Sequence, residues 1–156
     1  MPVLKRNFGI WSSQPEGGRF HKDKDEKISK IILENNYDAL ILIGNEEKIK
    51  ELKKLDINKE NKVKIIETKG MLEVAELIKG ADLVVSPDTS IVHLARGFNK
   101  KMICIYRKEL GKEDKNSILW GPNSEKAKVI FVEEKIKDGE EININCIDLN
   151  KFKKEM

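Results

Sequence analysis

The strongest constraint on the fold comes from the stretch Lys79–Tyr106, which has the pattern of a strand, a turn, a helix and a second strand. Leu83, Val84 and Val85 form an apolar run that is too short for a helix and is typical of a strand buried on both faces. Met102–Tyr106 is a second run of this kind. A helical connection of this length predicts that the two strands lie parallel in one sheet.

The turn between these strands carries the signals of a helix start. Ser86 and Pro87 are expected to end the first strand, and Asp88 to cap the helix, because its carboxylate can accept the free amide hydrogens of the first turn. Apolar residues follow at helical spacing and are expected to face the core: Ile91, Leu94, Ala95 and Phe98. We expect the helix to end near Gly97–Asn99.

The start of this helix is a candidate anion site. A helix N-terminus at the carboxyl edge of a parallel sheet offers unpaired amide hydrogens and the positive end of the helix dipole. The backbone amides of Thr89, Ser90 and Ile91, together with the two hydroxyl groups, can therefore bind phosphate. His93 can donate toward a phosphate or orient Asp88 or Thr89. The alternative interpretation is that Asp88 and Thr89 only cap the helix and that His93 is a half-buried structural residue.

The rest of the chain repeats the alternation of strand and helix. Further strands are expected at Phe8–Ser12, Ala39–Ile43, Lys62–Ile66 and Lys128–Val132. Further helices are expected at Asp23–Asn36, Glu46–Leu55, Met71–Lys79 and about 147–156, with Asp56–Asn61 as a polar connection. In the terminal helix, Ile147 and Phe152 are expected to point inward. The pattern predicts a Rossmann-like, three-layer α/β fold, with a parallel sheet and helices on both faces, in a single domain of residues 1–156.

Composition excludes several classes of protein. The chain has 156 residues, 30 Lys and Arg, 27 Asp and Glu and a net charge of +3, and no basic stripe points to nucleic acid. Cys104 and Cys146 lack metal-ligand spacing, so we expect reduced thiols in a cytoplasmic protein. We expect no signal peptide, and no apolar run reaches the length of a membrane span. The absence of Gly-x-Ser-x-Gly and Gly-x-Gly-x-x-Gly turns argues against a hydrolase and a dehydrogenase.

The residues Ala81–Thr89, followed by His93–Ala95 and a strand, resemble the signature of glycosyltransferase family 9, the ADP-heptose:lipopolysaccharide heptosyltransferases. In words, that signature is Ala-Asp, an apolar strand, Asp-Thr-Gly, two further residues and His-Leu-Ala. Four residues depart from this signature. Ser90 stands where the family usually has Gly, and Arg96 where it has a small residue. Lys101 stands where Pro is common, and Arg107 where Gly often follows the strand. Because these positions border the donor pocket, they leave the identity of the donor sugar open.

The resemblance implies one half of a two-domain GT-B enzyme. The chain resembles the carboxyl-terminal, donor-binding half, and we expect it to be a fragment cut at the domain boundary. The amino-terminal domain would hold the acceptor and the general base, so no catalytic group is assigned here. The implied reaction is inverting transfer of heptose or a related sugar from a nucleotide sugar, expected to be ADP-linked, in lipopolysaccharide or lipooligosaccharide core synthesis. No metal or other cofactor is expected, and the implied location is the cytoplasm, with peripheral contact at the inner membrane face.

The resemblance also implies site residues. The loop Gln14–Lys22 would bring a cation to the donor phosphates, either Arg19 or Lys22, with Ser13 at its start. Arg19 is preferred because Gly17–Gly18 lets the backbone approach a ligand closely. The alternative is an ordinary surface loop with both charges in water.

Asp88 would accept hydrogen bonds from sugar hydroxyls. The loop after the third strand would lie near the base and ribose, which makes Thr68, Lys69 and Met71 nucleoside candidates, although a methionine at a helix start more often fills a core. Two other functions stay open at this point: a non-catalytic nucleotide-sugar-binding module, and half of a GT-B-type sugar-nucleotide epimerase.

Overall fold

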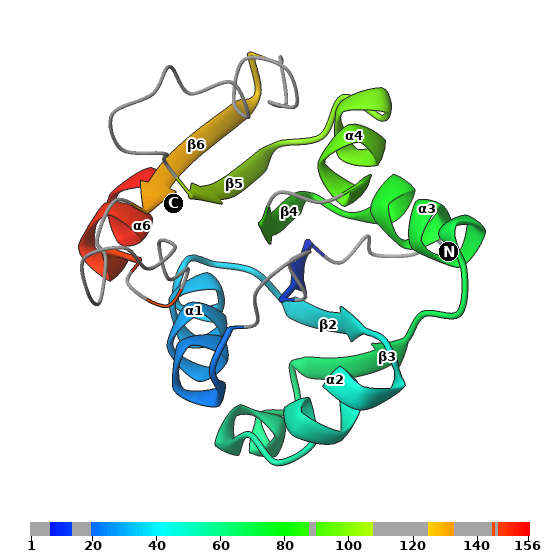
Figure 1. The fold of residues 1–156 in the computed structure, drawn as a ribbon, viewed down its shortest axis with the longest axis vertical. Helices are drawn as coiled ribbons and strands as arrows, with labels where there is room; N and C mark the ends of the chain where they lie inside the picture. The colour runs from blue at the N-terminus through cyan, green and yellow to red at the C-terminus, as the bar shows by residue number, and fades with distance from the viewer. Residues whose placement is uncertain (1–6, 14–19, 88–89, 108–124, 133–144, 146) are drawn as a thin grey trace, which may run out of the picture.

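The fold is built on one parallel β-sheet (Figure 1). The computed structural model describes residues 7–13, 20–87, 90–107, 125–132, 145 and 147–156. Within them, six strands pair in the order β3-β2-β1-β4-β5-β6, and every neighbouring pair is parallel. The strands are β1 (Phe8–Ser12), β2 (Ala39–Gly44), β3 (Val63–Glu67), β4 (Leu83–Pro87), β5 (Met102–Arg107) and β6 (Ala127–Val132). The predicted α/β class and parallel sheet are confirmed.

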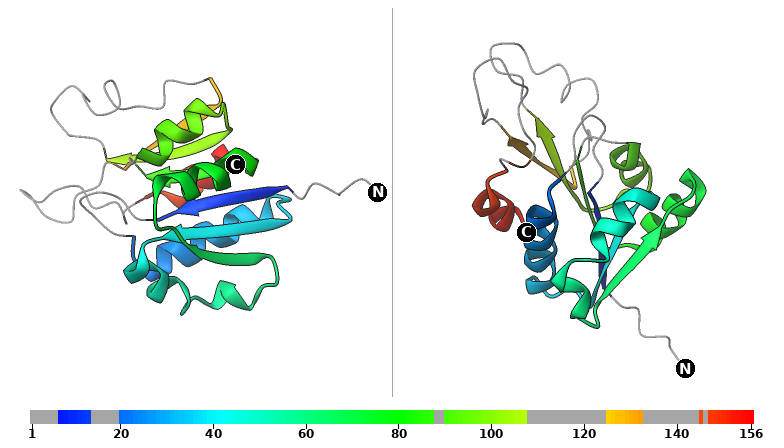
Figure 2. Two further views of the ribbon diagram at one scale, coloured as in Figure 1. Left: turned by 90° about the vertical axis from the view of Figure 1, so that its right-hand side faces the viewer. Right: turned by 60° about the horizontal axis from the view of Figure 1, so that its bottom comes forward.

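Helices cover both faces of this sheet, which confirms the three layers. The helices are α1 (Lys22–Glu34), α2 (Glu46–Leu52), the 3-10 helix η1 (Asp56–Lys59), α3 (Met71–Gly80), α4 (Ser90–Gly97) and α6 (Leu149–Glu155). Side chains of α1, α2, η1 and α6 share one hydrophobic core, whereas those of α3 and α4 share the other. Figure 2 shows α1 and α6 on one side of the strands and α3 and α4 on the opposite side.

Side chains alternate between the two faces of the sheet along each strand, so each central strand contributes to both cores. In β1, Trp11 belongs to the core under α1, and its neighbour Ile10 belongs to the core under α3 and α4. Both side chains are 0% exposed. A strand with helices on each face must bury every residue in this way, which is why the central strands read as continuous apolar runs in the sequence.

The chain changes direction across the sheet at β1. From β1 the chain proceeds to β2 on one side, and later returns through α3 to β4 on the other side. Trp11 of β1 pairs with Leu42 of β2 and with Val85 of β4, so Ser13 and Pro87 both lie two residues beyond this level, toward the carboxyl edge. Ligands of open parallel sheets bind at such a switch point.

Several predicted boundaries were wrong by a few residues. Strand β4 continues through Ser86 and Pro87, which were expected to end it. A proline at the last position of a strand removes no hydrogen bond from the strand's interior. The expected polar connection after α2 contains η1, because Ile57 is 4% exposed and packs into the core beside α1. Helix α1 begins at Lys22, one residue earlier than expected.

The inward face of α4 is confirmed for three of its four predicted residues. Ala95 is buried, and Ile91 and Leu94 are partly buried and pack against the same core. Phe98 is 39% exposed, so its predicted inward position is wrong, and Val92 is buried although it was not predicted to be. Asn99 adopts a φ of 54°, in the left-handed region that ends helices, close to the predicted end. Phe98 follows the last residue of α4, Gly97, which accounts for its exposure.

The terminal helix α6 packs as predicted. Phe152 is 0% exposed and Ile147 is 4% exposed, and both belong to the core shared with α1. The Asp148 side chain caps the helix by accepting hydrogen bonds from the amides of Asn150 and Lys151. None of the helices in the described part of the chain is long and apolar enough to cross a membrane.

Candidate functional site

The candidate residues that the structure describes lie around the carboxyl edge of the sheet. Ser13 follows β1, Thr68 and Lys69 follow β3, and Ser90 follows β4. Asp88, Thr89 and Arg19, which were also predicted to contribute, lie outside the described residues. Because parallel strands end at a common edge, this topology brings together segments that are far apart in the sequence.

The predicted phosphate and nucleoside residues adjoin one another at α4 and α3. Ser90, the first residue of α4, is exposed, and its hydroxyl donates to the Met71 sulfur at 3.9 Å. Met71 is 48% exposed, so the interpretation as core filling is wrong. An exposed thioether beside a helix N-terminus is a surface on which an aromatic base can pack. Ile91 is partly buried behind Ser90.

The backbone between β3 and α3 is held by hydrogen bonds. The amide of Thr68 donates to the carbonyl of Gly44 at 3.2 Å, which ties the end of β3 to the end of β2. The amide of Lys69 donates to the Glu73 carboxylate at 3.0 Å. The Lys69 side chain is exposed, and Thr68 is partly buried. The loop therefore has a fixed backbone from which Lys69 can reach a ligand.

His93 lies on the solvent-facing side of α4. It is exposed, as is Arg96 three residues further along the helix. The half-burial of His93 in the alternative interpretation is therefore not observed. Its exposed position is compatible with contact to a ligand near the start of α4.

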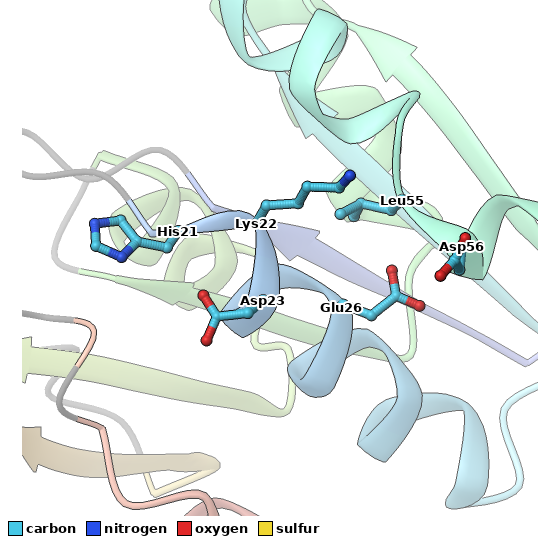
Figure 3. A pocket seen from close by; sticks show the side chains of 6 residues that line it. All are labelled: His21, Lys22, Asp23, Glu26, Leu55 and Asp56. Atoms are coloured by element: carbon cyan, nitrogen blue, oxygen red, sulfur yellow. The ribbon is translucent and has the colours of Figure 1, made fainter.

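Lys22 is the first residue of α1, and its exposed side chain extends toward Leu55 (Figure 3). A pocket of about 460 Å³ lies there, between the first turns of α1 and the start of η1. Its lining residues are His21, Lys22, Asp23, Glu26, Leu55 and Asp56. The three carboxylates disfavour a phosphate ligand. Of the predicted site residues in the described part of the chain, only Lys22 lines this pocket.

Among the described residues, no group of three or more His, Cys, Asp or Glu side chains is arranged to hold a metal ion. Cys104, in β5, is a buried thiol that forms no disulfide, as expected, and Cys146 lies outside the described residues.

A buried ion pair beneath the end of β1 was not predicted. Lys48 Nζ of α2 lies 2.7 Å from Asp25 Oδ2 of α1, and each side chain is only 1% exposed. The same ammonium donates to the Phe20 carbonyl at 2.9 Å and to Glu51 Oε2 at 3.2 Å. Trp11 Nε1 donates to Asp25 Oδ1 at 3.0 Å. The pair thus connects β1, α1 and α2 directly below the switch point.

Burial governs the electrostatics of this pair. It raises the pKa of the Asp25 carboxyl above its ordinary value of 3.8, against the opposing effects of Lys48, Trp11 and Ser13. Ser13 is completely buried beside this carboxylate, and no described residue gives its hydroxyl oxygen a hydrogen bond of good geometry. In this structure Ser13 therefore faces the interior, so contact with a phosphate would require its hydroxyl to turn outward.

A signal for this pair was present in the sequence. Asp25 lies three residues before Ile28 and seven before Ile32, on the inward stripe of α1. Lys48 lies four residues before Leu52, on the inward stripe of α2. Each of these two helices carries one charged residue on its apolar face. When both helices pack on the same face of the sheet, the acid and the base are expected to form an ion pair, because neither charge is stable when buried alone.

About half of each of several solved glycosyltransferase structures has the same fold as this chain. E. coli ADP-heptose lps heptosyltransferase II matches with a TM-score of 0.72 and 18% identity over 98% of the chain. E. coli heptosyltransferase WaaC with ADP matches with a TM-score of 0.70 and 17% identity over 99% of the chain. The glycosyl transferase family 9 structure from Veillonella parvula matches with a TM-score of 0.73 and 12% identity over 99% of the chain. In each comparison the chain covers 46% of the other protein, so it corresponds to about half of such an enzyme.

Sequence comparison identifies the family directly. None of the curated proteins is similar enough in sequence to match the chain. The sequence model of glycosyltransferase family 9 (heptosyltransferase), however, matches residues 14–146, which include the strand-turn-helix motif that runs from β4 through α4 to β5. The chain therefore belongs to glycosyltransferase family 9.

Proposed function

We propose that this chain is the carboxyl-terminal, nucleotide-sugar-binding domain of an inverting glycosyltransferase that acts without a metal. The donor is an ADP-linked heptose or a related sugar, and the pathway is lipopolysaccharide or lipooligosaccharide core synthesis at the inner membrane face. The amino-terminal half of the enzyme supplies the acceptor site and the general base. The ADP in one of the similar structures supports the choice of nucleotide.

The observation that carries the proposal is the contact between Ser90 and Met71. A phosphate-binding helix start and an exposed apolar side chain meet at 3.9 Å, beside the switch point of a family 9 domain. A nucleoside diphosphate binds to a pair of neighbouring surfaces of these two kinds. Its phosphates accept hydrogen bonds from amide groups, and its base packs against an apolar side chain.

In the proposed reaction the leaving group is the nucleoside diphosphate, and the role of this domain is to stabilise its negative charge. As the acceptor hydroxyl attacks the anomeric carbon, negative charge grows on the departing diphosphate. The amides of Thr89, Ser90 and Ile91, with the cation of Arg19 or Lys22, stabilise that charge by hydrogen bonds positioned in advance. Asp88 and the exposed His93 orient the sugar and the phosphates.

Calorimetric titration of the 156-residue chain with ADP, UDP and GDP tests the proposal. We expect micromolar-range binding of ADP and weaker binding of the other two nucleotides. The double variant Thr89→Ala, Arg19→Ala should weaken ADP binding by about 10- to 100-fold, because charge-assisted hydrogen bonds are lost. A folded chain that binds none of the three nucleotides would count against the proposal. Equal ADP affinity of the native chain and the variant would show that Thr89 and Arg19 are not part of the phosphate site.

A further inference from the structure

We infer that Glu73 is a positioning residue for the nucleoside end of the site, because its carboxylate fixes the turn from which α3 presents Met71. The inference rests on the proposed function, in which the base of the nucleotide packs on Met71. It adds a residue that the family motif does not include, since Glu73 lies in the first turn of α3. Glu73 acts on the nucleotide through the backbone, without touching it.

The carboxylate of Glu73 closes a ring around the start of α3. Glu73 Oε2 accepts a hydrogen bond from the Lys69 amide at 3.0 Å, four residues back in the sequence. Gly70 between them is the N-cap residue of the helix and has no side chain with which to cap it. A glutamate at the third helical position that bonds back to the backbone before the helix is the arrangement of a capping box. Met71 lies inside this ring, so the hydrogen bond restrains its backbone.

The segments on either side of the ring are anchored to the rest of the fold. Before it, the Thr68 amide donates to the Gly44 carbonyl at 3.2 Å, which joins the turn to β2. After it, Val74 is 5% exposed and packs in the core shared with α4. Gly70 lies between these anchors, and a glycine gives the backbone more freedom than any other residue. The hydrogen bond to Glu73 removes that freedom, so the turn keeps one path from the sheet to the helix.

The path of this turn decides where the thioether of Met71 lies. The Met71 side chain is 48% exposed, and its sulfur accepts from the Ser90 hydroxyl at 3.9 Å. A methionine side chain is unbranched and flexible, so a fixed backbone is needed to hold the sulfur beside the start of α4. A surface that is held in place before the ligand arrives binds more tightly, because less conformational freedom is lost on binding.

The charge of Glu73 argues against a direct contact with the donor phosphates. The side chain is exposed, and a carboxylate repels a diphosphate. In the first turn of a helix, however, the same negative charge is favourable, because it lies at the positive end of the helix dipole. Positioning of the turn therefore accounts for this carboxylate better than phosphate binding does.

Two variants of Glu73 separate its hydrogen bond from its charge. Glu73→Gln keeps an oxygen that can accept from the Lys69 amide, whereas Glu73→Ala removes it, and both lack the charge. Glu76→Ala, which alters an exposed glutamate of the same helix, is the matched control. In the absence of nucleotide, hydrogen exchange at the Lys69 amide should be about fivefold faster in Glu73→Ala than in the other two variants. Equal exchange rates in all three variants would overturn the inference.

Titration with ADP and with inorganic pyrophosphate tests the effect on the site. We expect Glu73→Ala to bind ADP about fivefold more weakly than Glu73→Gln does. The two variants should have equal affinity for pyrophosphate, which lacks the base. In a Met71→Ala background they should also bind ADP equally, since the side chain that Glu73 positions is gone. An ADP difference that persists in this background would overturn the inference, as would weaker pyrophosphate binding by Glu73→Ala than by Glu73→Gln.

The same titrations distinguish failure of this inference from failure of the proposed function. If the native chain binds ADP and the two Glu73 variants bind it equally well, Glu73 does not position the site, and the proposed function stands. If the native chain binds no ADP, the proposed function fails, and the inference fails with it.

Discussion

Lys48 Nζ and Asp25 Oδ2 lie 2.7 Å apart in a part of the core where both side chains are 1% exposed. Two charges that are withdrawn from water to this degree are tolerated only as partners, since either one alone would keep its full desolvation cost. The pair also joins α1 to α2 across one face of the sheet. This relationship between two residues from successive helices yields predictions on stability, on pH dependence and on local packing.

Removal of the cation alone should be strongly destabilising. Lys48→Met leaves the Asp25 carboxylate buried with only the Trp11 N–H as a strong partner, so we expect a loss of about 3–5 kcal/mol in the free energy of unfolding. Lys50→Met is the control, because Lys50 is 74% exposed and its pair with Glu46 is 4.0 Å long. That change should cost less than about 1 kcal/mol. Urea denaturation of both variants measures the difference, and equal losses would contradict the prediction.

The raised pKa of Asp25 predicts a direction for the pH dependence of stability. The folded state holds the Asp25 proton more tightly than the unfolded state does, so this carboxyl contributes stability below pH 3.8 that is lost as the pH rises through the folded pKa. Asp25→Asn removes this titration and keeps the other carboxyl groups. The free energy of unfolding of the native chain, minus that of the variant, should therefore fall from acidic to neutral pH. A difference that rises over this range would mean that Lys48 outweighs burial.

Gly44 should not tolerate a side chain, because Lys48 passes directly beside it. A Cβ at this position would lie 3.0 Å from Lys48 Cβ and 3.1 Å from Lys48 Cγ, the inflexible base of that side chain. We expect Gly44→Ala to lower the free energy of unfolding by about 1–3 kcal/mol.

Gly97→Ala is the matched control for Gly44→Ala. A Cβ at Gly97 would meet nothing within 4 Å, and alanine is favoured in a helix. Thermal unfolding should show Gly44→Ala melting below the native chain and Gly97→Ala melting at or above it. A native melting temperature for Gly44→Ala would show that the base of the Lys48 side chain can shift freely.

Met71 and its neighbour Leu72 should differ in their effect on nucleotide binding. Both are exposed, at 48% and 85%, and the Met71 sulfur accepts a hydrogen bond from the Ser90 hydroxyl. We expect Met71→Ala to weaken ADP binding by about tenfold and Leu72→Ala to leave it unchanged, since a base at the proposed site packs on the thioether. Fluorescence titration with a labelled ADP measures both, and an effect of Leu72→Ala alone would place the base on the other side of α3.

Local patterns in the sequence were sufficient for the fold class. Short apolar runs such as Leu83–Val85 and Met102–Tyr106 predicted buried strands, and the helical spacing between them predicted parallel connections. The inward placement of Phe152 in α6 was also predictable from spacing. These features depend on periodicity within a few residues, which a sequence displays directly.

Features that depend on contacts between elements were predicted less well. Ile57 was assigned to a polar connection, yet it is buried in η1, because the adjacent core offers its side chain a place to pack. In α4, Ala95 is buried as predicted, but Val92 is also buried without having been predicted, and Phe98 is 39% exposed. Adjacent stripes on a short helix differ little in hydrophobicity, so packing against the sheet decides between them.

By itself, the sequence determined the alternation of strands and helices, the parallel sheet and the family 9 motif around Ser90. Each of these features depends on the pattern of residues that are close together in the sequence. Only the tertiary structure decided that Ser90 meets Met71 and that Asp25 meets Lys48. Those residues are 19 and 23 positions apart, and no local pattern states which helices will share a face of the sheet. The strand order decides which helices share a face. With β1 placed between β2 and β4, the chain moves in one direction across the sheet through α1 and α2 and in the opposite direction through α3 and α4, so right-handed connections place these two pairs on opposite faces.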